Sequence, residues 1–335
     1  MGKFIVRRFL GMIFVLLVVA IITFLIVHAV PGGPFDRERR LPDNVIANIE
    51  ARYNLDDPIT QQFVDYVNEA AIPHITDDDL QRTTLTDYLI NINLPGDKTL
   101  RWGNFGPSYA SRGRTVTDIF RVNFPISAEL GVYAFVIAIA VGIPAGMIAA
   151  LNRNTLYDYL GMSIAIVGIS VPVIILGPIM QYIFGVELGL LPITGWGSWE
   201  EAIMPSVALG FSNSALIARL TRASLLQVLH EDYIRTANAK GLFQRRVIGV
   251  HALKNAMIPV ATIFGPLLAA LITGTVVTET IFNISGIGQE FVNSITNRDY
   301  PLVMGTVLLF AFFLVIANTL VDITYAALDP RIRYD

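Results

Sequence analysis

The chain has 335 residues, of which 53% are hydrophobic and only 15% charged, and its mean hydropathy is +0.56. Soluble domains carry about 25% charged residues, so this composition predicts an integral membrane protein. The net charge of -3 lacks the basic excess of nucleic-acid-binding proteins, and the absence of cysteine excludes disulfides and thiolate metal sites.

Six stretches are long and apolar enough to cross a bilayer as helices, which takes about 20 residues each. They lie near 9–30, 125–150, 158–186, 203–228, 257–283 and 301–326. The first follows Lys3, Arg7 and Arg8, as a signal peptide would, but its apolar run exceeds the usual length of about 7 to 15 residues. We therefore expect an uncleaved span. Glycine and proline inside spans, as in GISVP at 168–172, fit kinks that neighbouring helices support.

Residues 31–124, between the first two spans, are expected to form a small folded cap. In PDNVIANIEARYNL, the side chains of Val45, Ile46, Ile49 and Tyr53 share one helical face. A mere linker is the alternative, but linkers rarely carry such periodic apolar residues. The predicted fold is an all-α integral membrane protein with six transmembrane helices and an extracytoplasmic cap between helices 1 and 2.

The distribution of Lys and Arg in the short loops predicts the orientation. Fourteen such residues lie outside the cap segment, and thirteen face the cytoplasm if both termini do, leaving only Arg298 outside. We therefore expect a multi-pass protein of the cytoplasmic (cell) membrane. Residues 1–30 would form the cytoplasmic N-terminus and first span, and 125–335 a five-helix core.

The polar stretch EDYIRTANAKGLFQRR, from Glu231 to Arg246, then lies in a cytoplasmic loop between spans four and five. Residues 232–240 are expected to form a short amphipathic helix with Tyr233, Ile234 and Ala237 on one face. Gly241 suits the position just past a helix end, and a second helix from 244 to 255 would enter the membrane at Met257. A surface that docks a protein and a segment that faces lipid both fit this pattern.

The run YIRTANAKGL, followed by HALKNAMIPV, resembles the EAA loop of ABC-importer permeases of the oligopeptide, dipeptide and nickel group. The resemblance implies an ATPase-coupling loop at about 231–258, whose short helix docks on the ATPase subunit. By matching position, the small-residue and turn positions fall on Ala237, Ala239 and Gly241, and the polar frame on Arg235, Thr236 and Lys240. Asn238 departs from the family, where Arg or Lys is common, and Leu242 completes the motif.

Motifs along nearly the whole chain resemble the B-type permease of oligopeptide importers. They are PGGPFDRERRLP, FGPS, RTVTDIF, FPISAELG, SGIGQEFVNSITNRDY and LDPRIRY. About 30 residues near 70–101 look longer than the corresponding family segment. The SGIGQE loop resembles a family loop near the pore mouth, which implies external docking of a binding protein; its candidate residues are Gly286, Gly288, Gln289, Arg298 and Asp299.

The sequence contains no phosphate-binding GxxxxGK[ST] motif, so ATP and Mg are expected on partner subunits and no cofactor in this chain. We assign no catalytic residue, and the four scattered histidines lack metal-ligand spacing. Glu129, Glu279 and Asp322 sit near the ends of expected spans, where they can face water or cap helices. Without an ionisable group in mid-bundle, a proton-coupled carrier is disfavoured.

The sequence and the resemblance together predict a non-enzymatic permease subunit that forms the translocation path for oligopeptides in an ATP-driven importer. The expected partners are a homologous second permease, two ABC ATPase subunits, an extracytoplasmic peptide-binding protein, the lipid bilayer and the peptide substrate, with no nucleic acid. The same architecture carrying dipeptides, nickel chelates or another small solute is one alternative. A stand-alone secondary carrier and a receptor that senses ligand through the cap are alternatives of other classes.

Overall fold

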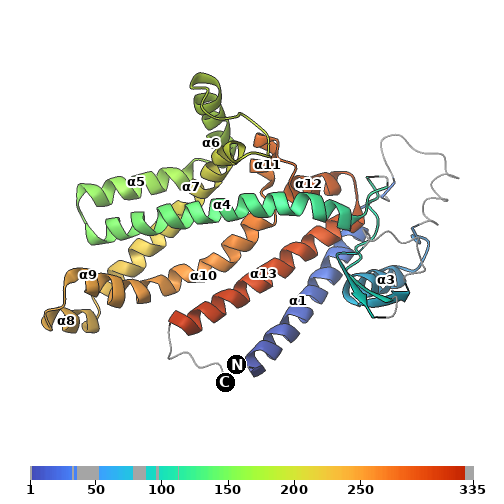
Figure 1. The fold of residues 1–335 in the computed structure, drawn as a ribbon, viewed down its shortest axis with the longest axis horizontal. Coiled ribbons are helices and arrows are strands. Elements are labelled where there is room, and N and C mark those ends of the chain that lie inside the picture. Colours follow the sequence, from blue (N-terminus) through green and yellow to red (C-terminus); the bar gives the residue numbers. More distant parts are fainter. Residues whose placement is uncertain are drawn as a thin grey trace. The chain divides into compact units, whose positions relative to one another are not determined.

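The computed structural model describes residues 2–31, 34–35, 53–77, 88–95, 98–111 and 113–328. Figure 1 shows the course of the chain, which divides into two compact units. The first unit comprises Met1–Leu10, Ile126–Gly286 and Phe313–Asp335, and the second comprises Gly11–Pro125 and Ile287–Phe312. Each is described by itself below.

Helices dominate the described residues. Their bounds are α1 (Gly2–Ala29), α3 (Ile59–Ala71), α4 (Val116–Leu151), α5 (Leu156–Ser170), α6 (Val173–Met180), η2 (Gln181–Glu187), α7 (Trp199–Leu229), α8 (Asp232–Ala239), α9 (Gln244–Arg246), η3 (Val247–Ala252), α10 (Leu253–Ile272), α11 (Val276–Phe282), α12 (Ile287–Thr296) and α13 (Tyr300–Leu328), where η2 and η3 are π-helical. Five helices within these ranges are long and apolar enough to cross a membrane: Val6–Ala29, Val116–Leu151, Trp199–Leu229, Gln244–Ile272 and Tyr300–Ile323. They correspond to the first, second, fourth, fifth and sixth expected spans.

The third expected span is not one continuous helix. α5 ends at Ser170, Val171 is extended with φ -92° and ψ 107°, and α6 begins after Pro172. Proline disfavours the helical conformation in the residue before it and donates no backbone hydrogen bond, which explains the break. The expected stretch 158–186 is thus divided among α5, α6 and η2.

The fifth expected span is shifted toward the N-terminus. Its helix begins at Gln244, passes through η3 and ends at Ile272, and α11 follows as a separate short helix. Gly274 lies between them with φ +111°, a backbone conformation that β-carbons disfavour. The expected second helix of the loop, 244–255, and the apolar span after Met257 thus belong to one continuous helical segment, Gln244–Ile272.

The segment after α3 corrects the all-α expectation. Strands β1 (His74–Asp77), β2 (Ile90–Leu94) and β3 (Lys98–Trp102) form an antiparallel sheet in the order β1-β3-β2. Leu100 pairs with Ile75 on one side and Ile92 on the other. This sheet lies almost entirely within residues 70–101, the stretch that looks longer than the corresponding family segment. The expected helix face at Val45, Ile46 and Ile49 lies outside the described residues.

Close approach of helix backbones holds the first unit together. A β-carbon placed on Gly142 of α4 would lie 2.6 Å from the carbonyl oxygen of Ser214 in α7, and one on Gly210 of α7 would lie 2.8 Å from that of Ala134 in α4. Gly146 approaches the carbonyl oxygen of Ala218 in the same way. Small residues are what permit such contacts between helices in membranes. A core cluster that includes Leu130, Met204, Leu271 and Phe282 fills the neighbouring space.

An ion pair between a buried carboxylate and a partly exposed guanidinium links α5 to α7 in the first unit. The guanidinium of Arg222 donates from Nε and Nη2 to the two carboxylate oxygens of Asp158, both at 2.7 Å. The backbone amide of Asn154, a residue with φ +62°, also donates to Asp158 at 3.0 Å. The Asp158 side chain is only 3% exposed. Local sequence patterns do not indicate this pair, because its two residues are far apart in the chain.

Candidate functional site

The loop between α7 and α10 forms the expected short helix. α8 runs from Asp232 to Ala239, following His230 at the end of α7, and Asp232 in its first turn complements the positive end of the helix dipole. Thr236 Oγ1 donates to the carbonyl oxygen of Asp232 at 2.9 Å. In Figure 1, α8 and α9 lie at the same end of the first unit as the turn between α4 and α5.

The end of α8 is fixed by Gly241, which has φ +74°. Its amide donates to the carbonyl oxygen of Asn238 at 2.9 Å, and the amide of Leu242 donates to that of Ala237 at 3.4 Å. These two bonds form a Schellman motif, whose left-handed position favours glycine, and Leu242 packs in the same apolar cluster as Ala237. The predicted role of Gly241 as the turn residue is confirmed.

One face of α8 is buried against the helix bundle. Ile234 is 2% and Ala237 7% exposed, and both belong to a cluster with Leu225 of α7 and Ala150 of α4. Val247, Ala252 and Ala256, from η3 and α10, complete the buried cluster. Burying an isoleucine side chain stabilises by roughly 1.5–3 kcal/mol, so α8 is anchored to the ends of three helices.

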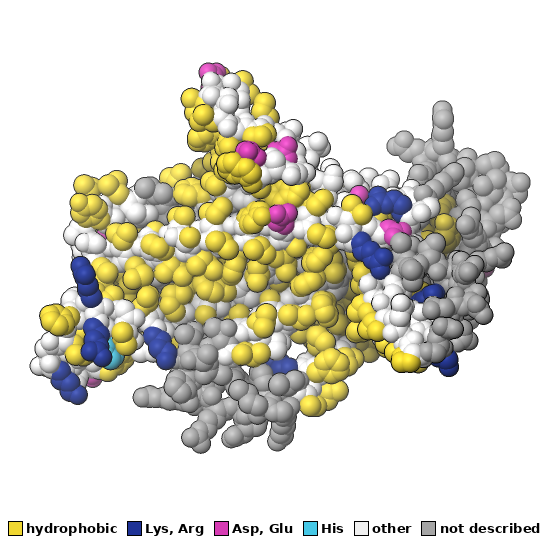
Figure 2. Space-filling model, in the orientation of Figure 1, with side chains coloured by type: hydrophobic (Ala, Val, Ile, Leu, Met, Phe, Trp, Pro, Cys, Tyr) yellow, Lys and Arg dark blue, Asp and Glu magenta, His cyan; other side chains and the backbone are white. Residues whose placement is uncertain are grey.

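The other face of α8 and the following turn are exposed. Phe243 is 85% exposed, an unusual state for a phenylalanine, and Tyr233 is 41% exposed. Figure 2 shows Lys and Arg side chains gathered at this end, in contrast to the apolar sides of the long helices. Solvent also reaches six of the eight predicted coupling residues: Arg235, Thr236, Asn238, Ala239, Lys240 and Gly241.

The remaining two predicted coupling residues, Ala237 and Leu242, face the bundle. Tyr233 was expected on one face with Ile234 and Ala237, but unlike them it is exposed, and its hydroxyl accepts a hydrogen bond from Asn255 Nδ2 at 2.8 Å. Arg235 contacts Asp232 at 3.4 Å, and both side chains are largely exposed. Exposed pairs of this kind contribute roughly 0–1 kcal/mol, so Arg235 is readily redirected to a partner.

The five candidate residues of the external loop are less uniform. Asp299 is fully buried, and its carboxylate accepts hydrogen bonds from the Ser108 hydroxyl and from the amides of Tyr109 at 3.1 Å and Ala110 at 3.2 Å. Gly286 and Gly288 are also buried, whereas Gln289 and Arg298 are half-buried. Asp299 therefore holds the 108–110 loop within the second unit. Two large apolar side chains nearby, Val292 and Ile295 of α12, are exposed.

The acidic residues near the expected span ends have different environments. Glu279 of α11 is fully buried, so of the two expected roles, facing water or capping a helix, it has the second. Its Oε1 accepts hydrogen bonds from Ser127 Oγ at 2.8 Å and from the Thr275 amide at 3.0 Å, which caps the start of α11. Glu129 lies on an exposed face of α4 and accepts from the Tyr133 hydroxyl at 2.6 Å, while Asp322 forms an ion pair with Arg8.

The fold is shared with chains of solved ABC transporters. The inward-facing methionine ABC transporter MetNI matches with a TM-score of 0.50 at 17% identity, covering 63% of this chain and 96% of that one. A chain of an amino acid ABC transporter matches with a TM-score of 0.50 at 13% identity, covering 63% and 94%.

Closer similarity is found in sequence. The chain is 42% identical, over the full length of both proteins, to the oligopeptide transport system permease protein OppB of Salmonella typhimurium and to that of Escherichia coli (strain K12). It is 40% identical to the dipeptide transport system permease protein DppB of Bacillus subtilis, covering 99% of this chain and 98% of that protein.

Two family models also match the chain. Residues 1–79 match the N-terminal model of binding-protein-dependent transport system membrane components. Residues 142–334, more than half of the chain, match the model of binding-protein-dependent transport system inner membrane components. The chain therefore belongs to the family of binding-protein-dependent transport system inner membrane components, and it is a permease of the ABC importer type.

Proposed function

We propose that this chain forms part of the translocation path for oligopeptides and that α8 couples it to ATP hydrolysis on partner subunits. The proposal is carried by one observation: α8 is anchored by Ile234 and Ala237 to the ends of three helices while its opposite face is polar and exposed. A surface that is rigid toward the bundle and open outward transmits a partner's displacement to the helices.

The substrate class rests on the full-length identity to oligopeptide permeases, at 42%. The 40% identity to a dipeptide permease makes dipeptides the second candidate. In either case we propose a complex with a second, homologous permease, two ABC ATPases that bind ATP and Mg, and an extracytoplasmic binding protein. Near the external loop, Val292 and Ile295 of α12, together with Arg298, are the residues we propose for contact with that binding protein.

For the topology, we propose six crossings with both termini in the cytoplasm and residues 31–124 outside. α5 has 15 residues and spans about 22 Å, so the extended link at Val171 and part of α6 would complete its crossing. With five crossings the termini would lie on opposite sides, against the distribution of Lys and Arg.

The topology can be tested in the natural cysteine-free background. We expect a membrane-impermeant maleimide added to intact cells to label Asp56→Cys in the cap and Leu190→Cys after η2. It should label Thr155→Cys, in the turn between α4 and α5, only after the membrane is opened. Equal labelling of positions 155 and 190 in intact cells would show that α5, α6 and η2 do not cross.

The coupling role is tested by ATP-dependent uptake of a labelled oligopeptide into vesicles that contain the complete complex, with Gly241→Asp as the variant. Space around Gly241 is open, and Asp tolerates a positive φ better than most residues, so the added charge acts mainly on the docking surface. We expect uptake and peptide-stimulated ATP hydrolysis to fall together, by about tenfold or more for a contact worth 1.4 kcal/mol.

Gly113→Asp is the matched control. Gly113 has φ +79° and equally open surroundings, but it belongs to the cap segment and not to the coupling loop. The control should transport normally. Unchanged uptake with Gly241→Asp in a properly inserted subunit would show that the loop only determines topology.

A further inference from the structure

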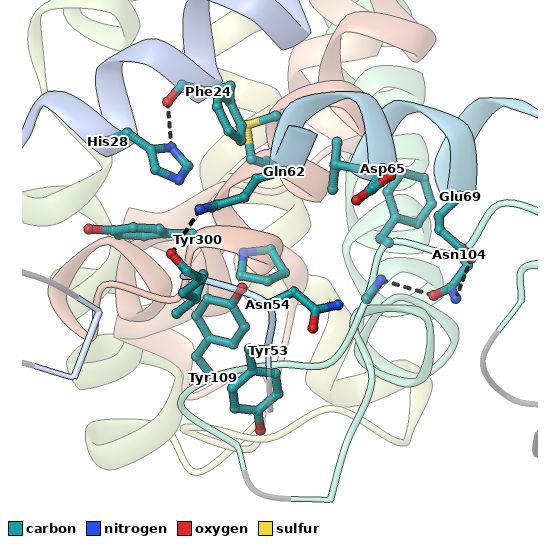
Figure 3. Close-up of a pocket in the computed structure, with 16 residues that line it drawn as sticks. Phe24, His28, Tyr53, Asn54, Gln62, Asp65, Glu69, Asn104, Tyr109 and Tyr300 are labelled. Atoms are coloured by element: carbon teal, nitrogen blue, oxygen red, sulfur yellow. Dashed lines mark hydrogen bonds between the residues drawn. The ribbon is translucent and has the colours of Figure 1, made fainter. Parts of the chain in front are cut away.

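The second unit contains a cavity of about 200 Å³ that the coupling mechanism does not use. Figure 3 shows the side chains that surround it. They come from the end of α1, the turn before α3, one face of α3, the 104–109 loop and the start of α13. The cavity is large enough for a small functional group and the chain that carries it.

Aromatic rings form one side of the cavity. The rings of Tyr53 and Tyr109 have centroids 4.9 Å apart, those of Tyr109 and Tyr300 are 6.4 Å apart, and His28 lies 5.1 Å from Tyr300. Phe24, also at the wall, contacts His28 at 4.0 Å. Aromatic faces carry a negative quadrupole and attract cations within about 6 Å.

Carboxylates line the opposite side. Asp65 and Glu69 lie one helical turn apart on α3, and no lysine or arginine is found among the described residues that line the cavity. Glu69 Oε2 accepts from Asn104 Nδ2 at 3.0 Å, which leaves its second oxygen available. Asp65 forms no hydrogen bond or ion pair with the described part of the chain. The formal charge of the lining is therefore negative.

The hydrogen-bond donors of the lining are largely engaged. Gln62 Nε2 donates both protons, to the carbonyl oxygens of Leu55 at 3.0 Å and Asp57 at 2.8 Å. His28 Nδ1 is directed at the Phe24 carbonyl oxygen at 2.8 Å, so Nε2 is an acceptor in the neutral ring. The remaining polar groups of the lining are hydrogen-bond acceptors. The exceptions are the side-chain amide of Asn54 and the tyrosine hydroxyls, which can donate or accept. The hydroxyl of Tyr66, also in the lining, is buried without a partner in the described structure.

We propose that this cavity binds an alkylammonium group, such as the amino terminus or a lysine side chain of a peptide. Three tyrosine rings attract the cation, the carboxylates of Asp65 and Glu69 balance its charge, and Gln62 Oε1 and His28 Nε2 accept from its N–H groups. An anion would meet two carboxylates and no cationic side chain in the described lining. The preference for an ammonium group is inferred from the cavity itself. The inference that a peptide supplies this group rests on the proposed function.

The test uses n-butylammonium as the probe and saturation-transfer NMR as the readout. The protein is the permease and ATPase complex in lipid nanodiscs without nucleotide or binding protein. We expect saturable binding of n-butylammonium and none of 1-butanol, its neutral analogue. Asp65→Asn and Tyr53→Leu should each weaken binding by about fivefold, since a partly exposed cation–π or ion-pair contact contributes on this scale.

Two variants serve as controls. Asp56→Asn removes an exposed carboxylate that lies just before α3 and outside the cavity, and it should leave binding unchanged. Tyr53→Phe retains the ring and should bind like the native chain, which separates loss of the ring from loss of folding. Equal signals from butylammonium and butanol, or equal weakening by Asp56→Asn and Asp65→Asn, would overturn the proposal.

Competition identifies the source of the ammonium. Displacement of the probe by trialanine amide, but not by its N-acetylated form, would assign a peptide amino terminus, and displacement by Nα-acetyl-lysine amide would assign a lysine side chain. Failure of both would rule out a peptide as the source. Probe binding is measured without transport. The coupling proposal, tested by uptake with Gly241→Asp, and the cavity proposal, tested by probe binding with Asp65→Asn, can therefore fail independently of each other.

Discussion

The carboxylate of Asp299 accepts the backbone N–H of Tyr109 at 3.1 Å, joining two residues that are 190 positions apart in the chain. The same carboxylate accepts from Ala110 and from Leu302 in the first turn of α13. It therefore closes a loop and caps a helix at once. Because the group is fully buried, its removal leaves several amides without a partner.

We predict that Asp299→Ala lowers the free energy of unfolding by about 1–3 kcal/mol, the penalty for unsatisfied buried polar groups. Hydrogen exchange at the amides of Tyr109 and Ala110 should accelerate more than elsewhere in the second unit. Asp56→Ala, at an exposed position, provides the baseline. Uniform acceleration across the whole unit would indicate global destabilisation without a specific effect on the loop.

Ile234→Ala should detach α8 from the bundle without altering its exposed face. Removing a buried isoleucine side chain typically costs about 2–5 kcal/mol when a cavity remains, and here that loss is local to the cluster around Ile234. We expect more ATP hydrolysed per peptide transported, measured in proteoliposomes. Val250→Ala, in η3 and 57% exposed, should behave like the native subunit. A normal transport stoichiometry with Ile234→Ala would refute rigid coupling.

Phe243→Ala should weaken docking of the ATPase while leaving the permease equally stable. The side chain is 85% exposed and so contributes little to folding, whereas exposed aromatic residues are frequent hot spots at interfaces. We expect the Kd between permease and ATPase to rise at least about thirtyfold, corresponding to the 2 kcal/mol of a typical hot spot. Ile75→Ala, which removes an exposed apolar residue from β1, is the control, and equal Kd values for the two variants would contradict the prediction.

The Asp158–Arg222 pair should show strong coupling in a double-mutant cycle. Arg222→Met leaves a buried carboxylate unpaired and is expected to cost about 3–5 kcal/mol of stability. The double variant Asp158→Leu with Arg222→Met should recover much of that loss, because the buried carboxylate is removed together with its partner. Thermal unfolding in detergent measures all three variants, and additive effects of the two single changes would exclude the coupling.

Alkaline pH should destabilise the second unit through Tyr109. Burial raises the pKa of its hydroxyl above the usual value, and the charge of Asp299 raises it further. The unfolded chain ionises near pH 10 while the folded state stays neutral, so stability is intact below pH 10 and falls as pH rises above it. Tyr109→Phe removes this site, and its melting temperature should decline less between about pH 9 and 11. Identical declines would show that Tyr109 does not contribute.

The sequence predicted α8 and Gly241 well, because both depend on neighbours within a few positions. The five long spans were equally accessible from composition. By contrast, the sequence did not predict that the helix ends at Val171 and Pro172. A proline within a continuous apolar stretch fits a kink as well as a helix end. The sheet escaped detection because its strands have four or five residues each and carry mixed polar and apolar side chains.

Contacts between distant positions were beyond the reach of local patterns. Asp158 and Arg222 are 64 positions apart, and Ser127 and Glu279 are 152 apart, so nothing in either local sequence indicates its partner. A residue such as Asp299 resembled a surface contact in the sequence, since it follows Asn297 and Arg298 in a polar run. Its burial depends on a loop that lies far earlier in the chain.

The glycine contacts between α4 and α7 restrict how the first unit can move. With backbone oxygens of one helix seated against Gly142, Gly146 and Gly210, sliding either helix by one turn would replace a glycine with a side chain and create a collision. The two helices must therefore travel as a single rigid body during each cycle. A displacement of α8 would therefore move α4 and α7 together. The hinges of the first unit are expected at helix breaks such as Pro172 and Gly274.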